Sequence, residues 1–480
     1  MSVITVSGFA PRSHARRWWV LAIAAAAQFI YVADAFVVNV ALPSIRADLA
    51  ASTGEMEGIV VFYLLAYAAL VVTGGRLGDI YGAKRVFIVG LSGFTVASLW
   101  CALAQSGGEL VLARTVQGAA AALMVPQVLA TIHRLFDGEE RSRAFGVYGA
   151  TLGLGAAFGF GLGGLLVSLD FASAGWRSIF FVNVPVGLPL IAAALRLMPA
   201  APRKAEVSLD VRGAGVLFLT LLCLLGPVVL SHDITEPYWL LAVMAIGAVL
   251  LSVFWRTEGA IERRGGMPLV PIALLADRQL AMGFFAVLFF AFANLAFYLA
   301  LTLYMQMGLH FSPLQSGSVV LPLALAFSLA SRLATRRAQR RGVAALIEGC
   351  GIQIGGLILL AAAVTWGDTA PATLACLLVV FGVGQGMLMA PLYNFVLSKL
   401  PAGQAGSGAG MISMVQQIGN GTGIATIGAI YFPLQSRFSD RIAFMVAIIV
   451  LVAALAVTAA LLRLIQQHAA ARRGLSAAAC

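Results

Sequence analysis

The sequence predicts an all-α membrane protein that crosses the bilayer fourteen times. Of its 480 residues, 61% are hydrophobic and only 11% are charged, too few to give a soluble chain its polar surface. The apolar residues also gather in unbroken runs of about 20, the length of helix that crosses a hydrocarbon core about 30 Å thick. A membrane β-barrel is disfavoured because the runs are apolar all round and do not alternate.

Fourteen such runs follow one another along the chain, and each predicts one helix. Their limits are 18–42, 57–77, 85–107, 109–132, 144–168, 177–198, 211–231, 238–255, 279–307, 313–335, 343–366, 371–397, 405–431 and 440–462. Because the number is even, both ends of the chain are expected on the same side of the membrane.

The basic residues predict which side that is. With a cytoplasmic N-terminus, 26 of the 31 lysines and arginines fall in cytoplasmic segments. The exceptions are Arg46, Arg177, Arg437 and Arg441 on the outside and Arg114 inside a span. Cytoplasmic loops carry such an excess, so we expect both termini in the cytoplasm. The same asymmetry accounts for the net charge of +11, which therefore does not indicate a nucleic-acid partner.

A weak internal repeat predicts how the helices are grouped. Residues 74–85 match residues 330–341 at Arg76 and Arg332 and at the basic pair that ends each segment, an offset of 256 residues. We therefore expect an N-terminal six-helix bundle at 1–198, a linker with two additional helices at 199–278, a C-terminal six-helix bundle at 279–463 and a cytoplasmic tail at 464–480. Paired bundles are typical of transporters that bind substrate between the halves.

Motifs that the chain lacks narrow its chemistry. None of the lysines, Lys84, Lys204 and Lys399, follows a glycine, so the sequence has no phosphate-binding Gly-Lys-Ser/Thr loop and should not be driven by ATP. It also lacks the His-Glu-x-x-His and Gly-x-Ser-x-Gly motifs, and its five cysteines show no metal-ligand spacing. We expect no enzyme activity, no metal and no cofactor, with a proton gradient as the energy source.

The segment between the second and third predicted helices carries the sharpest local motif. Residues 75–85 read GRLGDIYGAKR, with glycines that permit a tight turn and one acid among three cations near a helix start. Taken alone, such a segment also fits a basic loop that only sets topology. Its form resembles the signature loop of the major facilitator superfamily.

Three further segments resemble the fourteen-helix drug:proton antiporter branch of that superfamily. Residues 34–43 read DAFVVNVALP, residues 114–118 read RTVQG and residues 175–185 read GWRSIFFVNVP. The resemblance implies the major facilitator fold, two six-helix bundles plus two extra central helices, in a bacterial plasma membrane. It also implies proton-coupled efflux of lipophilic drugs or antibiotics by alternating access, as in multidrug and antibiotic-resistance transporters.

The resemblance further assigns the loop after the second helix to a conformational latch. Its residues are Gly75, Arg76, Gly78, Asp79, Gly82, Lys84 and Arg85. The latch is expected to close on the cytoplasmic side, against the helix start near residues 403–408. The corresponding loop at 332–341 lacks both acid and glycine, so we expect the latch to be asymmetric.

The fifth predicted helix departs from the antiporter pattern, which has Gly-Pro before its paired glycines. Here residues 159–164 read GFGLGG, with Phe160 at the proline position. Gly155, Gly159 and Gly163 still share one helix face at four-residue spacing. We predict that this face packs closely against a neighbouring helix.

Ionisable side chains inside the membrane are costly, so each one suggests a function. At helical rise, Asp34 and Arg114 lie about 12 Å and about 8 Å from the outer ends of their helices and should meet. Burial alone disfavours a charged carboxylate, whereas a nearby cation favours it. We predict that Asp34 carries protons and that Arg114 is its exchangeable partner, with a permanent ion pair as the alternative. Glu348 lies close enough to the cytoplasmic end to snorkel, and its part in proton transfer stays open.

Polar side chains on several helices predict a substrate cavity. They are Gln28, Tyr31, Gln117, Asn294, Tyr298, Gln416, Gln417 and Asn420. Hydrogen bonding between helices is the alternative explanation. Methionines nearby suit varied apolar compounds, because their side chains are flexible and polarizable. We expect a small, neutral or singly charged lipophilic substrate, with protons and the lipid bilayer as the other partners and the protein acting as a monomer.

Two other functions stay open at this point. One is a facilitator or symporter of the same superfamily for a metabolite or lipid; Asp34 argues against the facilitator, and only the direction of flux distinguishes the symporter. The other is a membrane-embedded receptor or anchor, which the internal repeat and the shortness of the linkers disfavour.

Overall fold

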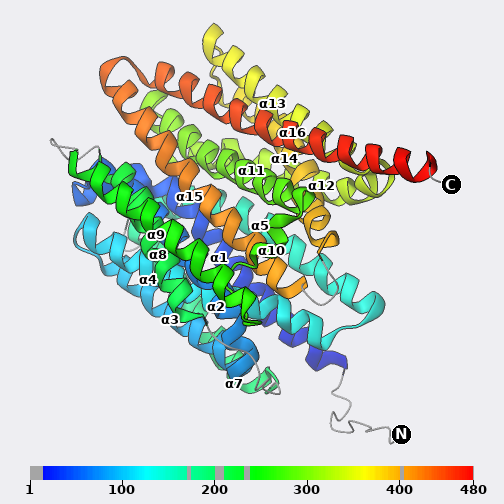
Figure 1. The fold of residues 1–480 in the computed structure, drawn as a ribbon. Helices are drawn as coiled ribbons and strands as arrows, with labels where there is room; N and C mark the ends of the chain where they lie inside the picture. Colours follow the sequence, from blue (N-terminus) through cyan, green and yellow to red (C-terminus); the bar gives the residue numbers. More distant parts are fainter. Residues whose placement is uncertain (1–13, 170–174, 201–209, 232–237, 401–404, 479–480) are drawn as a thin grey trace, which may run out of the picture.

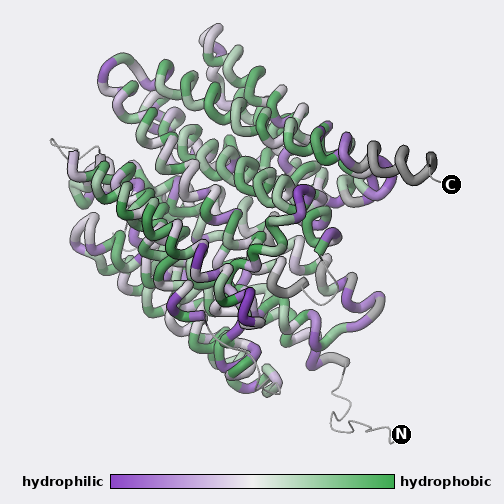
Figure 2. The backbone as a smooth tube through the Cα atoms, viewed as in Figure 1, coloured by the Kyte–Doolittle hydropathy of each residue, from purple (hydrophilic) through white to green (hydrophobic). Residues whose placement is uncertain are grey.

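The computed structural model describes residues 14–169, 175–200, 210–231, 238–400 and 405–478, and these ranges contain helices and turns but no strand. Figure 1 shows two groups of helices, one coloured blue to cyan and the other light green to red, with α8 and α9 lying along their junction. Hydrophobic residues dominate the helices, and hydrophilic ones gather mainly near helix ends (Figure 2). Long apolar helices are thus grouped as two bundles.

The bounds of the helices follow the predicted spans closely. The first group contains α1 (His14–Leu49), α2 (Thr53–Tyr81), α3 (Ala83–Leu103), α4 (Gly107–Leu135), α5 (Gly138–Leu169), a 3₁₀ turn (Gly175–Arg177), α6 (Ser178–Phe181) and α7 (Asn183–Leu197). Next come α8 (Val211–Leu230), α9 (Tyr238–Arg263) and the short α10 (Ile272–Ala276). The second group contains α11 (Arg278–Leu303) with a π-helical end (Tyr304–Gly308), α12 (Pro313–Arg341), α13 (Val343–Trp366), α14 (Pro371–Ser398), α15 (Ala405–Arg437) and α16 (Asp440–Ala478).

Thirteen helical segments in the described ranges are long and apolar enough to cross a membrane. The remaining predicted span forms α15, a helix of 33 residues whose apolar sequence is interrupted by Gln416, Gln417 and Asn420. This helix packs against α2 of one group and α11 of the other. The predicted all-α membrane fold is confirmed, and the helix that carries this polar cluster lies between the two groups.

The two groups repeat the same packing. α2 packs on α4 and α1 on α5, as α12 packs on α14 and α11 on α15. The register is 260 residues, from the Ser52 cap of α2 to the Ser312 cap of α12 and from Gly82 to Gly342 at the next turn. The predicted offset of 256 residues is therefore wrong by four. Arginines four residues apart repeat about once per helical turn, so charge matching alone does not detect a slip of one turn.

Residues 332–341 contain neither glycine nor acid, but the structure places one of each just beyond this segment. Gly342 joins α12 to α13 with a φ of 58°, as Gly82 joins α2 to α3 with a φ of 91°. Glu348 of α13 supplies the acid, since its carboxylate pairs with Arg337 at 2.7 Å and also with Arg341. Both halves thus place a glycine turn beside a salt bridge.

The two halves meet through symmetry-related helix pairs. α5 packs on α12, and α2 packs on α15. Gly164 brings the backbones of α5 and α12 together, because a Cβ added to it would lie 2.4 Å from the carbonyl oxygen of Pro313. Gln306 Nε2 donates to the carbonyl of Val40 at 3.0 Å, which links α11 to α1. These contacts lie toward the end of the bundle where α1 ends and α12 begins, and they hold the halves together there.

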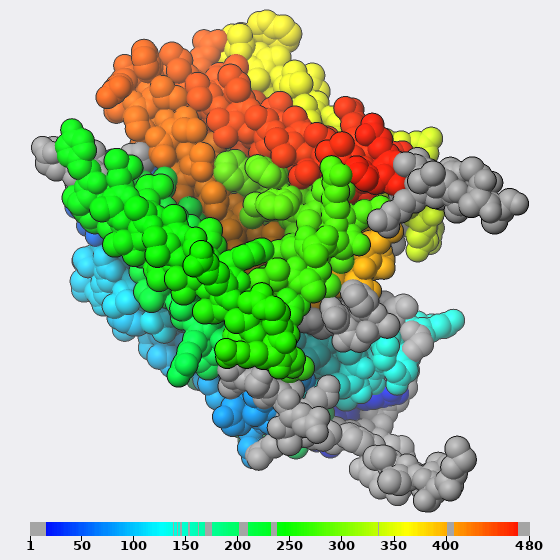
Figure 3. Space-filling model, viewed as in Figure 1, coloured from blue at the N-terminus to red at the C-terminus, as the bar shows by residue number. Residues whose placement is uncertain are grey.

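The additional helices cover the seam between the halves. α8 and α9 pack on each other, and α8 contacts both α2 and α15, one helix from each half. In Figure 3 their green surface runs across the junction on the facing side. A change in the angle between the halves would therefore alter the contacts of α8 with α2 and α15.

Several helices extend a few residues beyond their predicted limits, such as α1 to Leu49 and α9 to Arg263, and two segments differ more. α16 continues to Ala478, so the described part of the predicted tail at 464–480 prolongs the last helix. The sixth predicted helix is broken at its start into the 3₁₀ turn, α6 and α7. Trp176 and Arg177 fix this break to the end of α1, because both bind the carboxylate of Asp48.

Candidate functional site

Asp34 of α1 and Arg114 of α4 form an ion pair in the first bundle. Arg114 Nη1 lies 2.5 Å from Asp34 Oδ2, and neither side chain is exposed. Charge-assisted hydrogen bonds of this kind are about twice as strong as neutral ones. The structure thus brings together the two residues whose depth along their helices predicted that they would meet.

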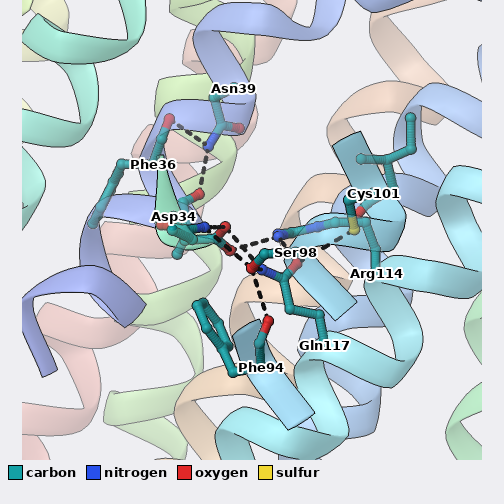
Figure 4. A network of polar contacts seen from close by, with 11 residues as sticks. Asp34, Phe36, Asn39, Phe94, Ser98, Cys101, Arg114 and Gln117 are labelled. Atoms are coloured by element: carbon teal, nitrogen blue, oxygen red, sulfur yellow. Dashed lines mark hydrogen bonds and ion pairs between the residues drawn. The ribbon is translucent and has the colours of Figure 1, made fainter. Parts of the chain in front are cut away.

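Two amides complete the surroundings of the Asp34 carboxylate. Gln117 Nε2 and Asn183 Nδ2 each donate to Asp34 Oδ1 at 3.0 Å. Ser98 Oγ accepts from both amides, at 2.8 Å from Gln117 and 3.3 Å from Asn183. Figure 4 shows Arg114 and Gln117 of α4 meeting Asp34, with Ser98 of α3 beside Gln117. Because α1, α3, α4 and α7 each contribute a group, a shift of any of these helices disturbs the network.

Gln117 has a different place from the one we predicted. It was expected in the substrate cavity, but its side chain is fully buried in the ion-pair network. Gln117 Oε1 accepts from Arg114 Nη1 at 2.6 Å while its amide nitrogen donates to Asp34. The residue therefore bridges both members of the pair.

Arg114 is held by weaker contacts on its other sides. Its Nε donates to the carbonyl of Ile59 at 3.3 Å, and its guanidinium carbon lies 4.0 Å from the centroid of the Tyr63 ring. Its Nη2 is buried without a hydrogen-bond partner among the described residues. A buried donor without an acceptor is unfavourable, which the cation–π contact offsets in part. Arg114 therefore has capacity for one more acceptor.

The glycine face of α5 packs directly against the part of α1 that carries Asp34. A Cβ added to Gly159 would lie 2.8 Å from the carbonyl oxygen of Ala33, and Gly155 and Gly163 approach α1 within 3.0 Å on the same measure. Any side chain larger than hydrogen at these positions would push the two helices apart. The three glycines thus fix α1 from the side opposite Arg114.

Tyr31, three residues before Asp34, reaches the second half of the molecule. Gln417 Nε2 of α15 donates to the Tyr31 hydroxyl at 3.2 Å, and Gln417 Oε1 accepts from Asn420 at 2.7 Å. The Tyr31 ring also stacks on Tyr67 of α2, with centroids 5.3 Å apart. Three of the predicted cavity residues therefore meet where α1, α2 and α15 converge.

Tyr298 of α11 occupies a second meeting point of the halves. Its ring centroid lies 4.9 Å from that of Phe160 on α5 and 5.4 Å from that of Phe36 on α1. Its hydroxyl donates to Gln385 Oε1 of α14 at 3.0 Å. Phe160, which stands where the antiporter pattern has proline, thus adds an aromatic ring to the interface between the halves.

The remaining predicted cavity residues, Asn294, Gln28 and Gln416, are not brought together at one place by any hydrogen bond among the described residues. Gln353 Nε2 of α13 donates to Asn294 Oδ1 at 3.2 Å, so Asn294 links helices inside the second bundle. Gln28 is buried, and its Oε1 has no hydrogen-bond donor among the described residues. Gln416 is half-buried on α15. Asn294 thus makes the hydrogen bond between helices that was the alternative to a place in the substrate cavity.

The signature loop uses partners that we did not predict. Asp79 pairs with Arg134 at the end of α4, at 3.2 Å, and the two side chains are 40% and 33% exposed. Lys84 Nζ donates to the carbonyl of Leu195 at 2.6 Å, and Arg85 is exposed. The expected partner segment near 403–408 lies partly outside the described residues. Asp79 is therefore held within the first half by α4.

The predicted loop is mostly helical, because α2 continues to Tyr81, α3 begins at Ala83 and Gly82 alone forms the turn between them. The glycines and the arginine of this segment have separate roles. A Cβ added to Gly78 would lie 2.0 Å from Gln127 Oε1 of α4, so a larger residue would displace the Gln127 side chain, whose amide donates to the Gly74 carbonyl. Gly75 has more space, with Pro126 Cβ at 3.7 Å on the same measure. Arg76 donates to the carbonyl of Met267 at 2.9 Å, in the segment that follows α9.

Sequence reasoning missed three polar residues of these sites. Asn183 stood in the quoted motif at 175–185 but received no role, and Ser98 is a lone hydroxyl in an apolar run. Glu57 marked the limit of a predicted span, yet its side chain is 1% exposed and its carboxylate lies against Gly428 of α15, where an added Cβ would be 2.1 Å from Oε1. A membrane-embedded acid thus lies between the two halves as well.

Comparison with protein families gives two overlapping matches to one family. The model of the Major Facilitator Superfamily matches residues 24–232 and residues 211–424. The probable actinorhodin transporter of Streptomyces coelicolor is 36% identical over 430 residues, which cover 88% of this chain and 74% of that protein. A puromycin resistance protein of Streptomyces alboniger is 35% identical over 429 residues, covering 86% and 82%. The matches span both helix bundles.

A solved structure shares the fold. The crystal structure of a D-xylose-proton symporter matches with a TM-score of 0.65 at 12% sequence identity, covering 92% of this chain and 97% of that one. At this identity the likeness concerns the arrangement of helices alone.

Proposed function

Because this chain belongs to the major facilitator superfamily, whose members are membrane transporters, we propose that it exports lipophilic drugs or antibiotics in exchange for protons. The observation that carries the proposal is the fully buried pair of Asp34 and Arg114. A carboxylate kept inside the membrane beside one exchangeable cation is suited to taking up and releasing a proton as the halves move.

The substrate class rests on the relatives. Two are the actinorhodin transporter and the puromycin resistance protein, and a third, 33% identical over 422 residues, is the cephamycin export protein of Amycolatopsis lactamdurans. These names have antibiotics in common. The aromatic and amide groups around Tyr31 and Tyr298 offer this chain both stacking and hydrogen bonding for such compounds.

The proposed orientation has both termini in the cytoplasm of a bacterial cell, with the helices in the plasma membrane. In Figure 1 the start of α1 and the end of α16 lie at the same end of the molecule. The contacts of Gly164 and Gln306 with the opposite half then lie toward the outer face. In this orientation the conformation is closed to the outside, the state in which substrate enters from the cytoplasm.

We propose the following order of events around Asp34. With the outside closed, the carboxylate is paired with Arg114, Gln117 and Asn183. Rocking of the halves moves α1, because α15 holds Tyr31 through Gln417. Once α1 shifts from α4, the carboxylate loses its cation and takes a proton from the outside. Return to the first arrangement restores the ion pair and releases the proton inward.

The signature loop serves in this scheme as the cytoplasmic latch. Asp79 and Arg134 hold the ends of α2 and α4 together, and Lys84 ties the start of α3 to α7. These contacts hold α4 and α7 in place on α2 and α3, so that α1 shifts against them when the halves move. No cofactor or metal takes part, the proton gradient supplies the energy, and one chain forms the transport unit.

Accumulation assays test this function. Cells that express the protein are loaded with puromycin, a panel of other lipophilic antibiotics and fluorescent dyes, with and without a protonophore. The proposal predicts lower accumulation of at least one compound and its recovery with the protonophore. Accumulation that rises above that of control cells, and falls with the protonophore, would instead indicate a symporter.

A further inference from the structure

Two acidic side chains meet at the junction of the middle helix pair and the signature loop, away from the Asp34 network. Asp210 caps the start of α8, where its Oδ1 accepts from the Gly213 amide at 2.7 Å. Glu258, near the end of α9, is 1% exposed, and its Oε2 accepts from the Val270 amide at 2.8 Å. The function proposed above uses neither residue.

The remaining oxygens of the two carboxyl groups face each other. Asp210 Oδ2 and Glu258 Oε1 are both buried without a hydrogen-bond partner among the described residues. They approach one point, because a Cβ added to Gly213 would lie 2.4 Å from the first and 2.7 Å from the second. Two carboxylates so close cannot both stay ionised in a buried site, whereas one shared proton gives both oxygens a partner.

A cation of α2 acts on both members of this pair. Arg76 of α2 interacts electrostatically with both acids and donates to the carbonyls of Met267 and Pro268 in the segment after α9. That segment contributes the Val270 amide rather than a charge. Glu262, one turn further along α9, is bound instead by the Ala273 amide at 3.1 Å. With one shared proton the pair keeps a single negative charge, which matches the charge of Arg76.

We propose that Asp210 and Glu258 form a second proton-binding site, in which one shared proton fastens the start of α8 to α9 and to the segment lying on Arg76. When the proton leaves, two like charges stand side by side and α8 separates from α9 at this end. The chain runs from α9 through this segment into α11, the first helix of the second half. The protonation state of the pair therefore acts on the connection between the halves, and its proton need not cross the membrane.

Infrared difference spectroscopy of the purified protein in lipid, recorded between mildly acidic and alkaline pH, tests the shared proton. We expect the carbonyl band of a protonated carboxyl group, which disappears at alkaline pH and is missing from both Glu258→Gln and Asp210→Asn. Each replacement keeps a hydrogen-bonding group of the same shape, and asparagine also caps a helix. Glu262→Gln is the matched control and keeps the band, because it alters a carboxylate on the same helix that is bound by the Ala273 amide and is not part of the pair.

A second measurement tests whether the shared proton holds α8 against α9 and the segment that follows it. A single cysteine replaces Met267 in a cysteine-free background, and its labelling rate is compared with that of the same protein carrying Glu258→Gln. We expect equal rates at acidic pH and several-fold faster labelling at alkaline pH when Glu258 is present. A carboxyl band that survives both substitutions, or equal rates at every pH, would overturn the proposal. Asp34→Asn leaves both readouts unchanged, so failure of the export function is distinguishable from failure of this site.

Discussion

Arg114 Nη1 and Asp34 Oδ2 lie 2.5 Å apart with neither side chain exposed, so each residue provides the charge that makes burial of the other tolerable. Such a pair is expensive to break from one side. Removing one member of a buried ion pair costs about 3–5 kcal/mol, because the other charge is left without compensation. The pair is therefore both a structural element of the first bundle and the point at which a proton can replace a cation.

Replacing Asp34 with asparagine should abolish export against a gradient. Asparagine keeps the size of the side chain but cannot bind and release a proton, and Gln117 still accepts from Arg114, so the fold is retained with a lower thermal midpoint. The measurement is drug accumulation together with thermal unfolding of the purified protein. Asp48→Asn is the control on the same helix: its partner Arg177 is at the exposed end, where an ion pair contributes about 0–1 kcal/mol. Uphill export by the Asp34→Asn protein would contradict the role given to this residue.

Replacing Asn183 should weaken export more than replacing Ser98. Asn183→Leu removes a donor from the Asp34 carboxylate, and a hydrogen bond to a charged group contributes about 1.5–3 kcal/mol. This corresponds to a loss of roughly tenfold to a hundredfold in the rate of proton-coupled export. Ser98→Ala leaves both amides on Asp34 and should cost less. Transport rates in proteoliposomes measure the difference, and equal losses would show that the order of contacts around Asp34 is misassigned.

Adding one methyl group to the glycine face of α5 should disturb α1. In Gly159→Ala the new Cβ would lie 2.8 Å from the Ala33 carbonyl oxygen, and overpacking of this kind costs about 1–3 kcal/mol. The shift displaces Asp34, so we expect both stability and transport to fall. Gly161→Ala, on the same helix, is the matched control because no atom lies within 4 Å of its added Cβ. Equal behaviour of the two variants would rule out close packing as the role of this face.

Neutralising the signature-loop salt bridge should shift the conformational equilibrium without removing substrate binding. Asp79→Asn and Arg134→Gln break the same contact, and both side chains are partly exposed, so each should cost at most about 1 kcal/mol of stability. Cysteine labelling from the two faces of the membrane reports the shift. Asp137→Asn, which breaks an exposed pair with Arg141 at the same end, should leave labelling unchanged. If cysteine labelling is the same in all three variants, Asp79 has no role in the latch.

The number and position of most helices can be predicted from the sequence, because a membrane helix needs a long run of apolar residues. The approach of Asp34 to Arg114 followed from helical rise alone, since both residues were placed at similar depths. The glycine spacing at 155, 159 and 163 likewise fixed a face, although not the helix it meets. The depth of a residue in the membrane can thus be predicted from the sequence when its type, such as a charged residue in an apolar span, makes it stand out.

The contacts that escaped prediction are those made by ordinary residues or by residues at span limits. Ser98 and Asn183 are neutral and common in membrane helices, so nothing in the sequence separates them from other polar positions. Glu57 was treated as a boundary, although its helix begins four residues earlier at Thr53. The offset between the halves slipped by one turn because four-residue spacing of arginines looks the same after a turn, and only the capping serines and the turn glycines fix it.

Proton movement driven by substrate tests the central claim most directly. Proteoliposomes containing the native protein and a pH-sensitive dye receive an antibiotic that the accumulation assay has identified as exported, and the internal pH is followed. We predict a substrate-dependent pH change of the sign required by exchange, absent from liposomes with the Asp34→Asn protein. Substrate movement without any change in pH, or a change of equal size in the Asp34→Asn protein, would contradict proton exchange through Asp34.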